Sequence, residues 1–219
     1  MAPVHIVRMR VWLPDRPGAL GSVASRIGGV KGDVVGIEIL EQGGGRAVDD
    51  LVVSLPDASL VDLLVAEVGE VDGVDVEEIV ALGPERHDPD LDALETAASL
   101  VSLTDAAELV EAFCRHVEVG TGAHWICVAD LDRRAVLAAS GPAPTFDWVH
   151  AFVVGSRSSE LVRSGQSGPD DILCSPLDHW GAVVLGRDGH PFRARERRRV
   201  NALAGILEAR LTQLVRPDA

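Results

Sequence analysis

The stretch that decides the fold of this chain is Asp15-Arg16-Pro17-Gly18-Ala19-Leu20. It follows an apolar segment, Ile6 to Leu13, that predicts a β-strand, and it leads into apolar residues at helical spacing from Leu20 to Ile27. We expect the Asp15 carboxylate to cap this helix and Pro17 to lie in its first turn. Because Gly18 has no side chain, a small anion could approach the N–H groups and the positive dipole end at the helix entrance.

The segments that follow predict the rest of a small α+β domain. Val34 to Gln42 and Ala47 to Leu55 are strands, and Gly43-Gly44-Gly45 joins them as a hairpin. A phosphate-binding loop is the alternative for these glycines, but no helix follows them and no Lys-Ser/Thr pair completes that motif. A second helix starts at Pro56 to Ser59, and a last strand runs from Val74 to Ala81. With right-handed crossovers, this order gives a ferredoxin-like βαββαβ sandwich with two helices on one sheet face.

The turn and the order of elements resemble an ACT domain over residues 1–82. The resemblance implies that the turn holds the polar end groups of a regulatory amino acid and that a facing strand lines the other side. The implied ligand-binding residues are Asp15, Arg16, Pro17, Gly18, Ala19, Leu20, Val35, Gly36, Ile37 and Glu38. Asp15 or Glu38 would accept from the ammonium group; the alternatives are that Asp15 only caps the helix and that Glu38 is only a solvated strand residue. Because ACT domains usually pair around their ligands, a homodimer or an internal pseudo-pair is also implied.

The sheet face opposite the two helices is expected to carry Arg8, Arg10 and Trp12, which alternate with apolar residues along the first strand. On an open face, Trp12 is expected to contact another subunit or the second domain. A singly exposed aromatic residue is the alternative.

The second half of the chain predicts another α+β domain after a linker and connecting helix at residues 83–103. The connecting helix, Leu91 to Leu103, has an apolar stripe that can pack on either domain, formed by Leu91, Leu94, Ala98 and Val101. Thr104 is expected to cap the next helix. The later expected elements are strands His124–Asp130 and Ala135–Ser140, a helix from Phe146 to about Arg163, strands Asp171–Leu177 and Trp180–Gly186, and a helix from Ala194 to about Leu214.

This order resembles a GAF domain over residues 104–219, with a helix, a hairpin, a middle segment, a second hairpin and a closing helix. The closest resemblance runs from Trp180 to Gly186 and continues through Pro191-Phe192, Glu196 and Leu203-Ala204. Domains of this family bind diverse small molecules or mediate dimerisation, so the resemblance names no ligand. A tetrapyrrole attachment is not supported, because no Cys lies next to a His.

The composition limits which partners the protein is expected to bind. The net charge of −14 argues against nucleic acid and anionic lipid, and we expect neither a nucleic-acid partner nor a membrane. The basic run from Arg193 to Arg199 is interpreted as a solvated helix start that pairs within the chain. No signal peptide and no membrane span are evident, so a cytoplasmic protein is expected. Lys31 is the only lysine, and the wealth of Ala, Val, Gly, Asp and Arg suggests a high-GC bacterial source.

Residue sets that would carry catalysis or bind a cofactor are missing from the sequence. The seven histidines are scattered without metal-ligand spacing, and no Cys-x-x-Cys, Walker or G-x-S-x-G motif occurs. The three cysteines, Cys114, Cys127 and Cys174, lie in apolar runs, where a thiol acts as a small core residue. We therefore expect no metal, no cofactor and no catalytic residue.

These observations predict an α+β, non-enzymatic regulatory protein that senses a small molecule, most simply an amino acid at an ACT-type dimer interface, and passes its state to an unidentified downstream protein. The alternative is a structural or interaction module in which both domains only mediate dimerisation and partner binding. A reductase acting through Cys127 or Cys174 is a third class, which would require an exposed thiol with a lowered pKa.

Overall fold

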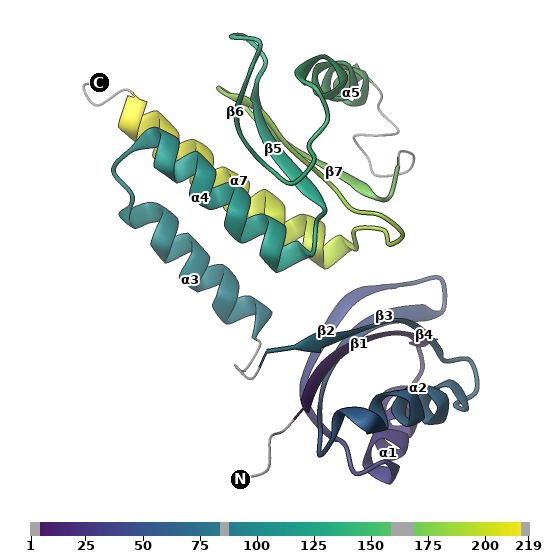
Figure 1. The fold of residues 1–219 in the computed structure, drawn as a ribbon. Helices are drawn as coiled ribbons and strands as arrows, with labels where there is room; N and C mark the ends of the chain where they lie inside the picture. Colours follow the sequence, from purple (N-terminus) through teal and green to yellow (C-terminus); the bar gives the residue numbers. More distant parts are fainter. Residues whose placement is uncertain (1–4, 84–87, 159–168, 216–219) are drawn as a thin grey trace. The chain divides into compact units, whose positions relative to one another are not determined.

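The computed structural model describes residues 5–83, 88–158 and 169–215, and the chain forms two compact units, Met1–Asp88 and Pro89–Ala219 (Figure 1). Each unit contains one antiparallel four-stranded sheet and helices that cover it. The predicted α+β class is confirmed. Within the described residues, no helix combines the length and the apolar character that crossing a membrane requires.

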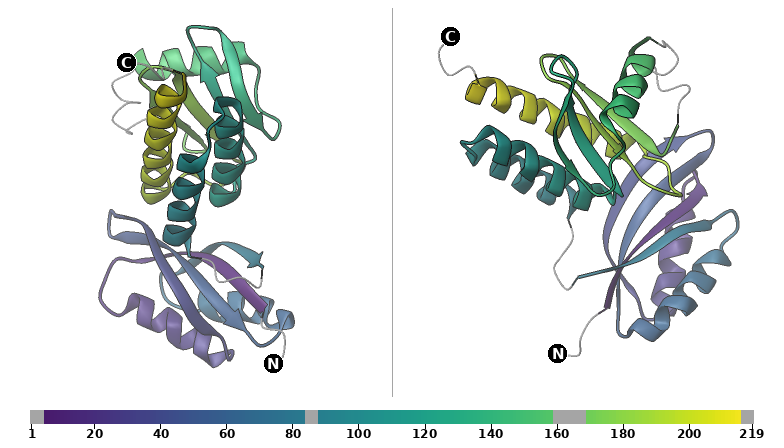
Figure 2. Two further views of the ribbon diagram at one scale, coloured as in Figure 1. Left: turned by 90° about the vertical axis from the view of Figure 1, so that its left-hand side faces the viewer. Right: turned by 45° about the horizontal axis from the view of Figure 1, so that its top comes forward.

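The first unit is a ferredoxin-like sandwich, as predicted. Its elements are β1 (His5–Pro14), α1 (Ala19–Gly29), β2 (Asp33–Gly43), β3 (Arg46–Leu55), a short 3-10 turn η1 (Ala58–Leu60), α2 (Val61–Gly69) and β4 (Asp75–Leu82). The strands lie in the order β2-β3-β1-β4, and every neighbouring pair is antiparallel. Both helices cover the same face of this sheet (Figure 2).

The core of the first unit lies between its sheet and its two helices. Alternate residues of β1 point into it, namely Val7, Met9, Val11 and Leu13. They meet Val23 and Ile27 of α1 and Leu64 and Val68 of α2, as the apolar periodicity predicts. Leu63 of α2, by contrast, is 47% exposed. The α2 helix contributes two fully buried side chains, Leu64 and Val68, to the core.

Two helix starts differ from the predictions. Asp105, and not Thr104, caps the helix α4 (Ala106–Thr121), because its carboxylate accepts a hydrogen bond of 2.9 Å from the Glu108 amide. The second helix of the first unit begins only after the 3-10 turn, which Asp57 caps through the Ser59 amide. At α4 the carboxylate that reaches the open amides sets the start of the helix, whereas α2 has no side-chain cap.

The second unit has helices on both faces of its sheet (Figure 1). Its elements are α3 (Pro89–Ser102), α4, β5 (Trp125–Asp130), β6 (Ala135–Ser140), α5 (Phe146–Ser158), β7 (Ile172–Leu177), β8 (Gly181–Gly186) and α7 (Ala194–Val215). The strand order is β6-β5-β8-β7. One face packs on α4 and α7, and the other packs on α5. The part of the predicted helix between residues 159 and 163 lies outside the described residues.

The helix α3 packs within the second unit rather than standing apart as a connector. Leu100 is buried against α4 and α7, and Ala97 and Leu103 pack beside it. The predicted stripe lies on the other side of the helix, where Leu94 is 68% exposed. The stripe is therefore not part of the core of the second unit.

Candidate functional site

The turn after β1 shapes the entrance of α1. The Asp15 amide donates to the Gly45 carbonyl over 2.9 Å, so the hairpin tip of β2 and β3 holds the start of the turn. Gly18 has a φ of 89°, a left-handed value, and it is the cap residue of the helix. The predictions for Asp15 and Pro17 are wrong: no side chain caps α1, and the helix begins at Ala19, after Pro17. The left-handed Gly18 sets the helix start in their place.

The amides at the start of α1 are available to a ligand. Among the described residues, the N–H groups of Leu20 and Gly21 have no hydrogen-bond acceptor, whereas the next amide, of Ser22, donates to the Gly18 carbonyl. A Cβ atom built on Gly18 or on Gly21 would meet nothing within 4 Å. Two amides and the helix dipole therefore point at open space, which is an arrangement that suits a carboxylate or another small anion.

The predicted strand residues divide between the two faces of the sheet. Ile37 lies opposite Leu51 of β3, so its side chain shares the face that α1 covers. Gly36 and Glu38 lie opposite Val52 and Asp50, on the other face. The structure thus places Ile37 on the side of the α1 entrance and Glu38 on the far side within one unit. Val35 and Ile37 are exposed, and β2 forms an edge of the sheet.

A buried acid that the sequence analysis did not select lies beside this region. Asp49 of β3 is 3% exposed, and its Oδ1 atom is fully buried without a hydrogen-bond partner among the described residues. Burial, together with the nearby charges of Asp50 and Asp15, raises the pKa of Asp49 to about 6. An acid inside an apolar strand was the available signal, because such a position favours Val or Ile.

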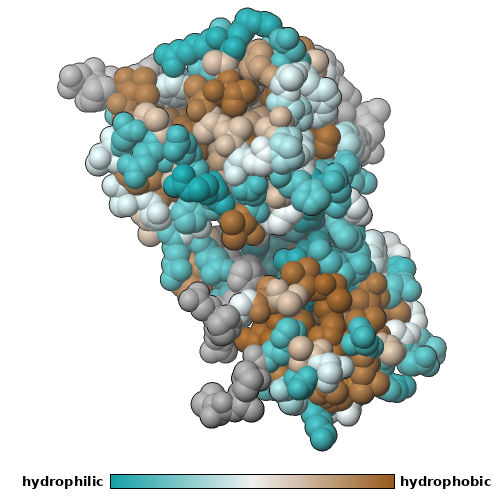
Figure 3. Space-filling view, in the orientation of Figure 1, coloured by the Kyte–Doolittle hydropathy of each residue, from teal (hydrophilic) through white to brown (hydrophobic). Residues whose placement is uncertain are grey.

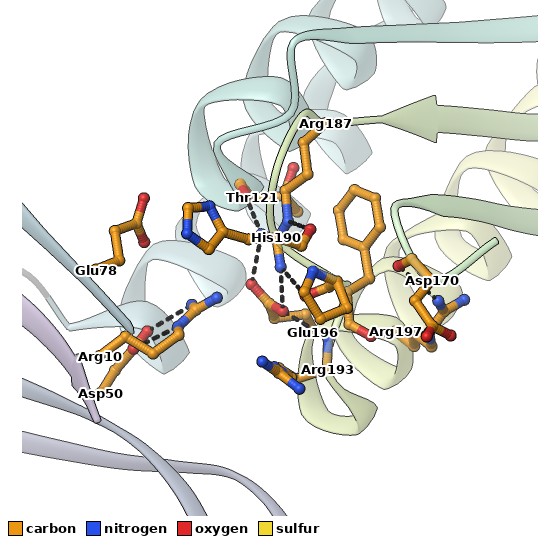
Figure 4. Close-up of polar contacts among 12 residues, drawn as sticks. Arg10, Asp50, Glu78, Thr121, Asp170, Arg187, His190, Arg193, Glu196 and Arg197 are labelled. Carbon is orange, nitrogen blue, oxygen red and sulfur yellow. Dashed lines mark hydrogen bonds and ion pairs between the residues drawn. The ribbon is translucent and has the colours of Figure 1, made fainter. Parts of the chain in front are cut away.

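The opposite face of the same sheet carries paired charges. Arg10 donates to both carboxylate oxygens of Asp50 at 2.8 and 2.9 Å, and the two side chains are buried (Figure 4). Trp12 donates from Nε1 to Glu77 over 2.5 Å, and the Arg46 guanidinium lies 5.1 Å from its ring centroid. Trp12 therefore has partners within its own unit, as a half-buried residue of a polar face.

In the second unit, the Arg187 side chain makes five hydrogen bonds. Its guanidinium makes two hydrogen bonds to Glu196, at 2.9 and 2.8 Å, and three more to the carbonyls of Thr121, His190 and Pro191 (Figure 4). Its carbon Cζ also lies 4.3 Å from the centroid of the Phe192 ring. Every nitrogen of this side chain is used, so the cluster is structural and offers no free donor to a ligand.

The other candidate functional residues of the second unit are also buried or paired within that unit. The Cys114 and Cys127 thiols are buried, and burial raises their pKa to about 12 and about 11. Of the basic run, Arg195 and Arg199 pair with Asp90 at 2.8 and 3.6 Å. Arg197 donates to backbone carbonyls at the start of α7. Within the described residues, no cluster of His, Cys, Asp and Glu could hold a metal ion.

No family model matches this chain, and no curated protein matches it. Among solved structures, an ACT domain from a GTP pyrophosphokinase of Chlorobium tepidum is 15% identical and covers 39% of this chain and 93% of its own, with a TM-score of 0.30. An uncharacterised protein of Thermotoga maritima is 20% identical over 37% of this chain and 100% of its own, with a TM-score of 0.30. A bacteriophytochrome of R. palustris is 9% identical over 96% of this chain and 58% of its own, with a TM-score of 0.46. These likenesses concern the fold alone.

Proposed function

We propose that this chain is a non-enzymatic regulatory protein whose first unit binds an amino acid between two copies of that unit. The observation that carries the proposal is the entrance of α1, where the amides of Leu20 and Gly21 lack acceptors among the described residues and Gly18 leaves the space open. These donors suit the carboxylate that every free amino acid has. The resemblance of the turn to that of ACT domains supports the same ligand class.

The edge strand β2 supports the pairing of two copies. Val35, Ile37 and Ile39 of this strand are exposed, and Ile37 is 51% exposed. Figure 3 shows a hydrophobic area on the face of the first unit that is turned to the viewer. An exposed edge strand with apolar side chains is normally covered, and a second copy of the same strand would cover it. A ligand that binds one arrangement of such a pair better than another would shift the population toward it.

The cellular setting is part of the proposal. Cys114, Cys127 and Cys174 are all free thiols in the structure, which accords with a reducing compartment such as the cytoplasm. The raised pKa of the buried Cys114 and Cys127 thiols speaks against thiol chemistry, because the reactive form is the thiolate.

An interaction module is the second candidate. The exposed stripe of α3, formed by Leu91, Leu94, Ala98 and Val101, has the alternating spacing of three and four residues that occurs where two helices pack. On this reading, α3 would bind a partner helix and the first unit would serve only for pairing.

A thermal-shift measurement with the twenty L-amino acids at millimolar concentration separates the two candidates. Binding to the native state must raise the melting temperature in a dose-dependent way. Gly21→Pro, which removes one amide of the entrance, should abolish the rise, whereas Gly21→Ala, which keeps this amide, should retain it. A melting temperature that none of the amino acids changes would favour the interaction module.

A further inference from the structure

Asp49 lies on the sheet face that the helices of the first unit cover. The register places it opposite Val11 of β1 and Ile39 of β2. Directly opposite residues share a face, and Val11 belongs to the core beneath the helices. Ala47, two residues before Asp49 on β3, packs in the same cluster as Ala19, the first residue of α1. Asp49 is therefore on the same side of the sheet as the entrance of α1.

The environment of the Asp49 carboxyl contains no compensating group. Its Oδ1 atom is buried and makes no hydrogen bond within the described part of the chain. The charges that act on it are those of Asp50 and Asp15, which are acidic as well. Arg10 lies on the opposite face of the sheet, where it donates two hydrogen bonds to Asp50. A buried acid without a donor is costly to the free protein.

Unsatisfied groups of opposite kinds thus lie on one side of this sheet. The amides of Leu20 and Gly21 are donors without an acceptor among the described residues, and the Asp49 carboxyl is an acceptor without a donor. A zwitterion carries the complement of both, because its carboxylate accepts and its ammonium donates. A metal ion does not fit this arrangement, since the described residues contain no cluster of three or more ligating side chains.

We propose that Asp49 accepts a hydrogen bond from the primary ammonium group of a bound amino acid whose carboxylate meets the amides of Leu20 and Gly21. This inference rests on the proposed function and assigns to Asp49 the role that the sequence analysis gave to Asp15 or Glu38. The Asp15 residue is exposed, so water already solvates its charge. Glu38 lies opposite Asp50 on the other face of the sheet within the same unit.

The test compares each L-amino acid that shifts the melting of the wild-type protein with the same molecule lacking its amino group, for example L-valine with isovalerate. Affinities are measured by titration calorimetry for the wild type, Asp49→Asn, Asp15→Asn and Glu38→Gln. Asp62→Asn, at an exposed position in the first turn of α2, is the matched control. Circular dichroism establishes that each variant is folded, and Asp49→Asn keeps the shape of the side chain while removing its charge.

We expect Asp49→Asn to weaken binding of the amino acid about tenfold or more, because a charge-assisted hydrogen bond is lost. Binding of isovalerate should change less than about twofold in the same variant. Equal loss for both molecules, or a loss in Asp15→Asn or Glu38→Gln in place of Asp49→Asn, would overturn the role of Asp49 and leave the proposed function standing. If no amino acid binds the wild type, the proposed function and this inference both fail.

Discussion

Asp49 and Asp50 are consecutive residues of β3, yet their carboxyl groups lie on opposite faces of the sheet and differ in their hydrogen bonding. Asp50 accepts two hydrogen bonds from Arg10, at 2.8 and 2.9 Å. The Oδ1 atom of Asp49 is buried and accepts none from the described residues. The same charge therefore stabilises the folded unit at one position and destabilises it at the next.

The first prediction concerns the pH dependence of stability. The pKa of Asp49 is raised from 3.8 to about 6 by burial and by the charges of Asp50 and Asp15. The folded protein binds the proton more tightly than the unfolded chain, so the free energy of unfolding falls as the pH rises from about 4 to above about 6. The raised pKa of Asp49 corresponds to a loss of about 3 kcal/mol in the free energy of unfolding over this pH range.

Replacing Asp49 by Asn should remove this dependence. We expect Asp49→Asn to be more stable than the wild type at pH about 8 and similar to it at pH about 4, because only the ionised form of the acid is penalised. Urea unfolding at both pH values, with hydrogen exchange of the β1 and β3 amides to report on the first unit, measures the difference. A difference between the two proteins that is independent of pH would contradict the prediction.

The second prediction has the opposite sign. Asp50→Asn should destabilise the first unit by about 3 kcal/mol, because it removes the carboxylate that accepts two hydrogen bonds from the buried Arg10 guanidinium. Asp75→Asn is the matched control, since the pair that Asp75 forms with Arg46 is exposed and should contribute less than about 1 kcal/mol. Denaturant unfolding of the three proteins at one pH compares them. If the two variants lost the same free energy of unfolding, the buried Arg10–Asp50 pair would contribute no more to stability than the exposed pair, which contradicts the prediction.

The periodicity of the sequence was sufficient to predict the helices and strands of the first unit. It was not sufficient to predict which partners the polar side chains have. The alternation in β1 correctly predicted that Val7 and Met9 are core residues. The face of Glu38, by contrast, depends on the register of β2 with β3, which shifts between Val34 and Gly36 and has no local sequence signature. Likewise, the hydrogen bond from Arg187 to the carbonyl of Thr121 joins positions 66 residues apart. Such contacts depend on the tertiary fold, and the local spacing of residues in the sequence does not predict them.

The third prediction concerns the cluster around Arg187. Glu196 binds the Arg187 guanidinium with both oxygens and also accepts a hydrogen bond of 2.7 Å from the Arg193 amide, which precedes the first residue of α7. Arg187→Lys should destabilise the second unit by about 3 kcal/mol, because an ammonium group cannot reproduce the planar set of five donors.

Arg115→Lys is the control for this substitution. Arg115 is 63% exposed and lies 3.9 Å from Glu111 within the same helix, so the exchange should cost less than about 0.5 kcal/mol. Unfolding followed by tryptophan fluorescence reports mainly on the second unit, which holds Trp125, Trp148 and Trp180, whereas the first unit holds Trp12. If Arg187→Lys were as stable as Arg115→Lys, the geometry of the guanidinium would not matter to this unit.

The last prediction concerns the glycine that ends the β5–β6 hairpin. Gly141 has a φ of +69°, and a Cβ atom there would lie 2.0 Å from the His124 carbonyl oxygen. This neighbour is backbone and cannot rotate away, so Gly141→Ala must shift the start of β5 as well as adopt a strained conformation. We expect a loss of at least about 2 kcal/mol, detected by the fluorescence of the adjacent Trp125 during unfolding.

Gly120→Ala supplies the contrast: a Cβ at this position of α4 meets nothing within 4 Å, and φ is not left-handed. Alanine should therefore stabilise α4 by up to about 1 kcal/mol. Equal effects of the two substitutions would mean that the hairpin end adapts freely, which contradicts the close approach of the two backbones.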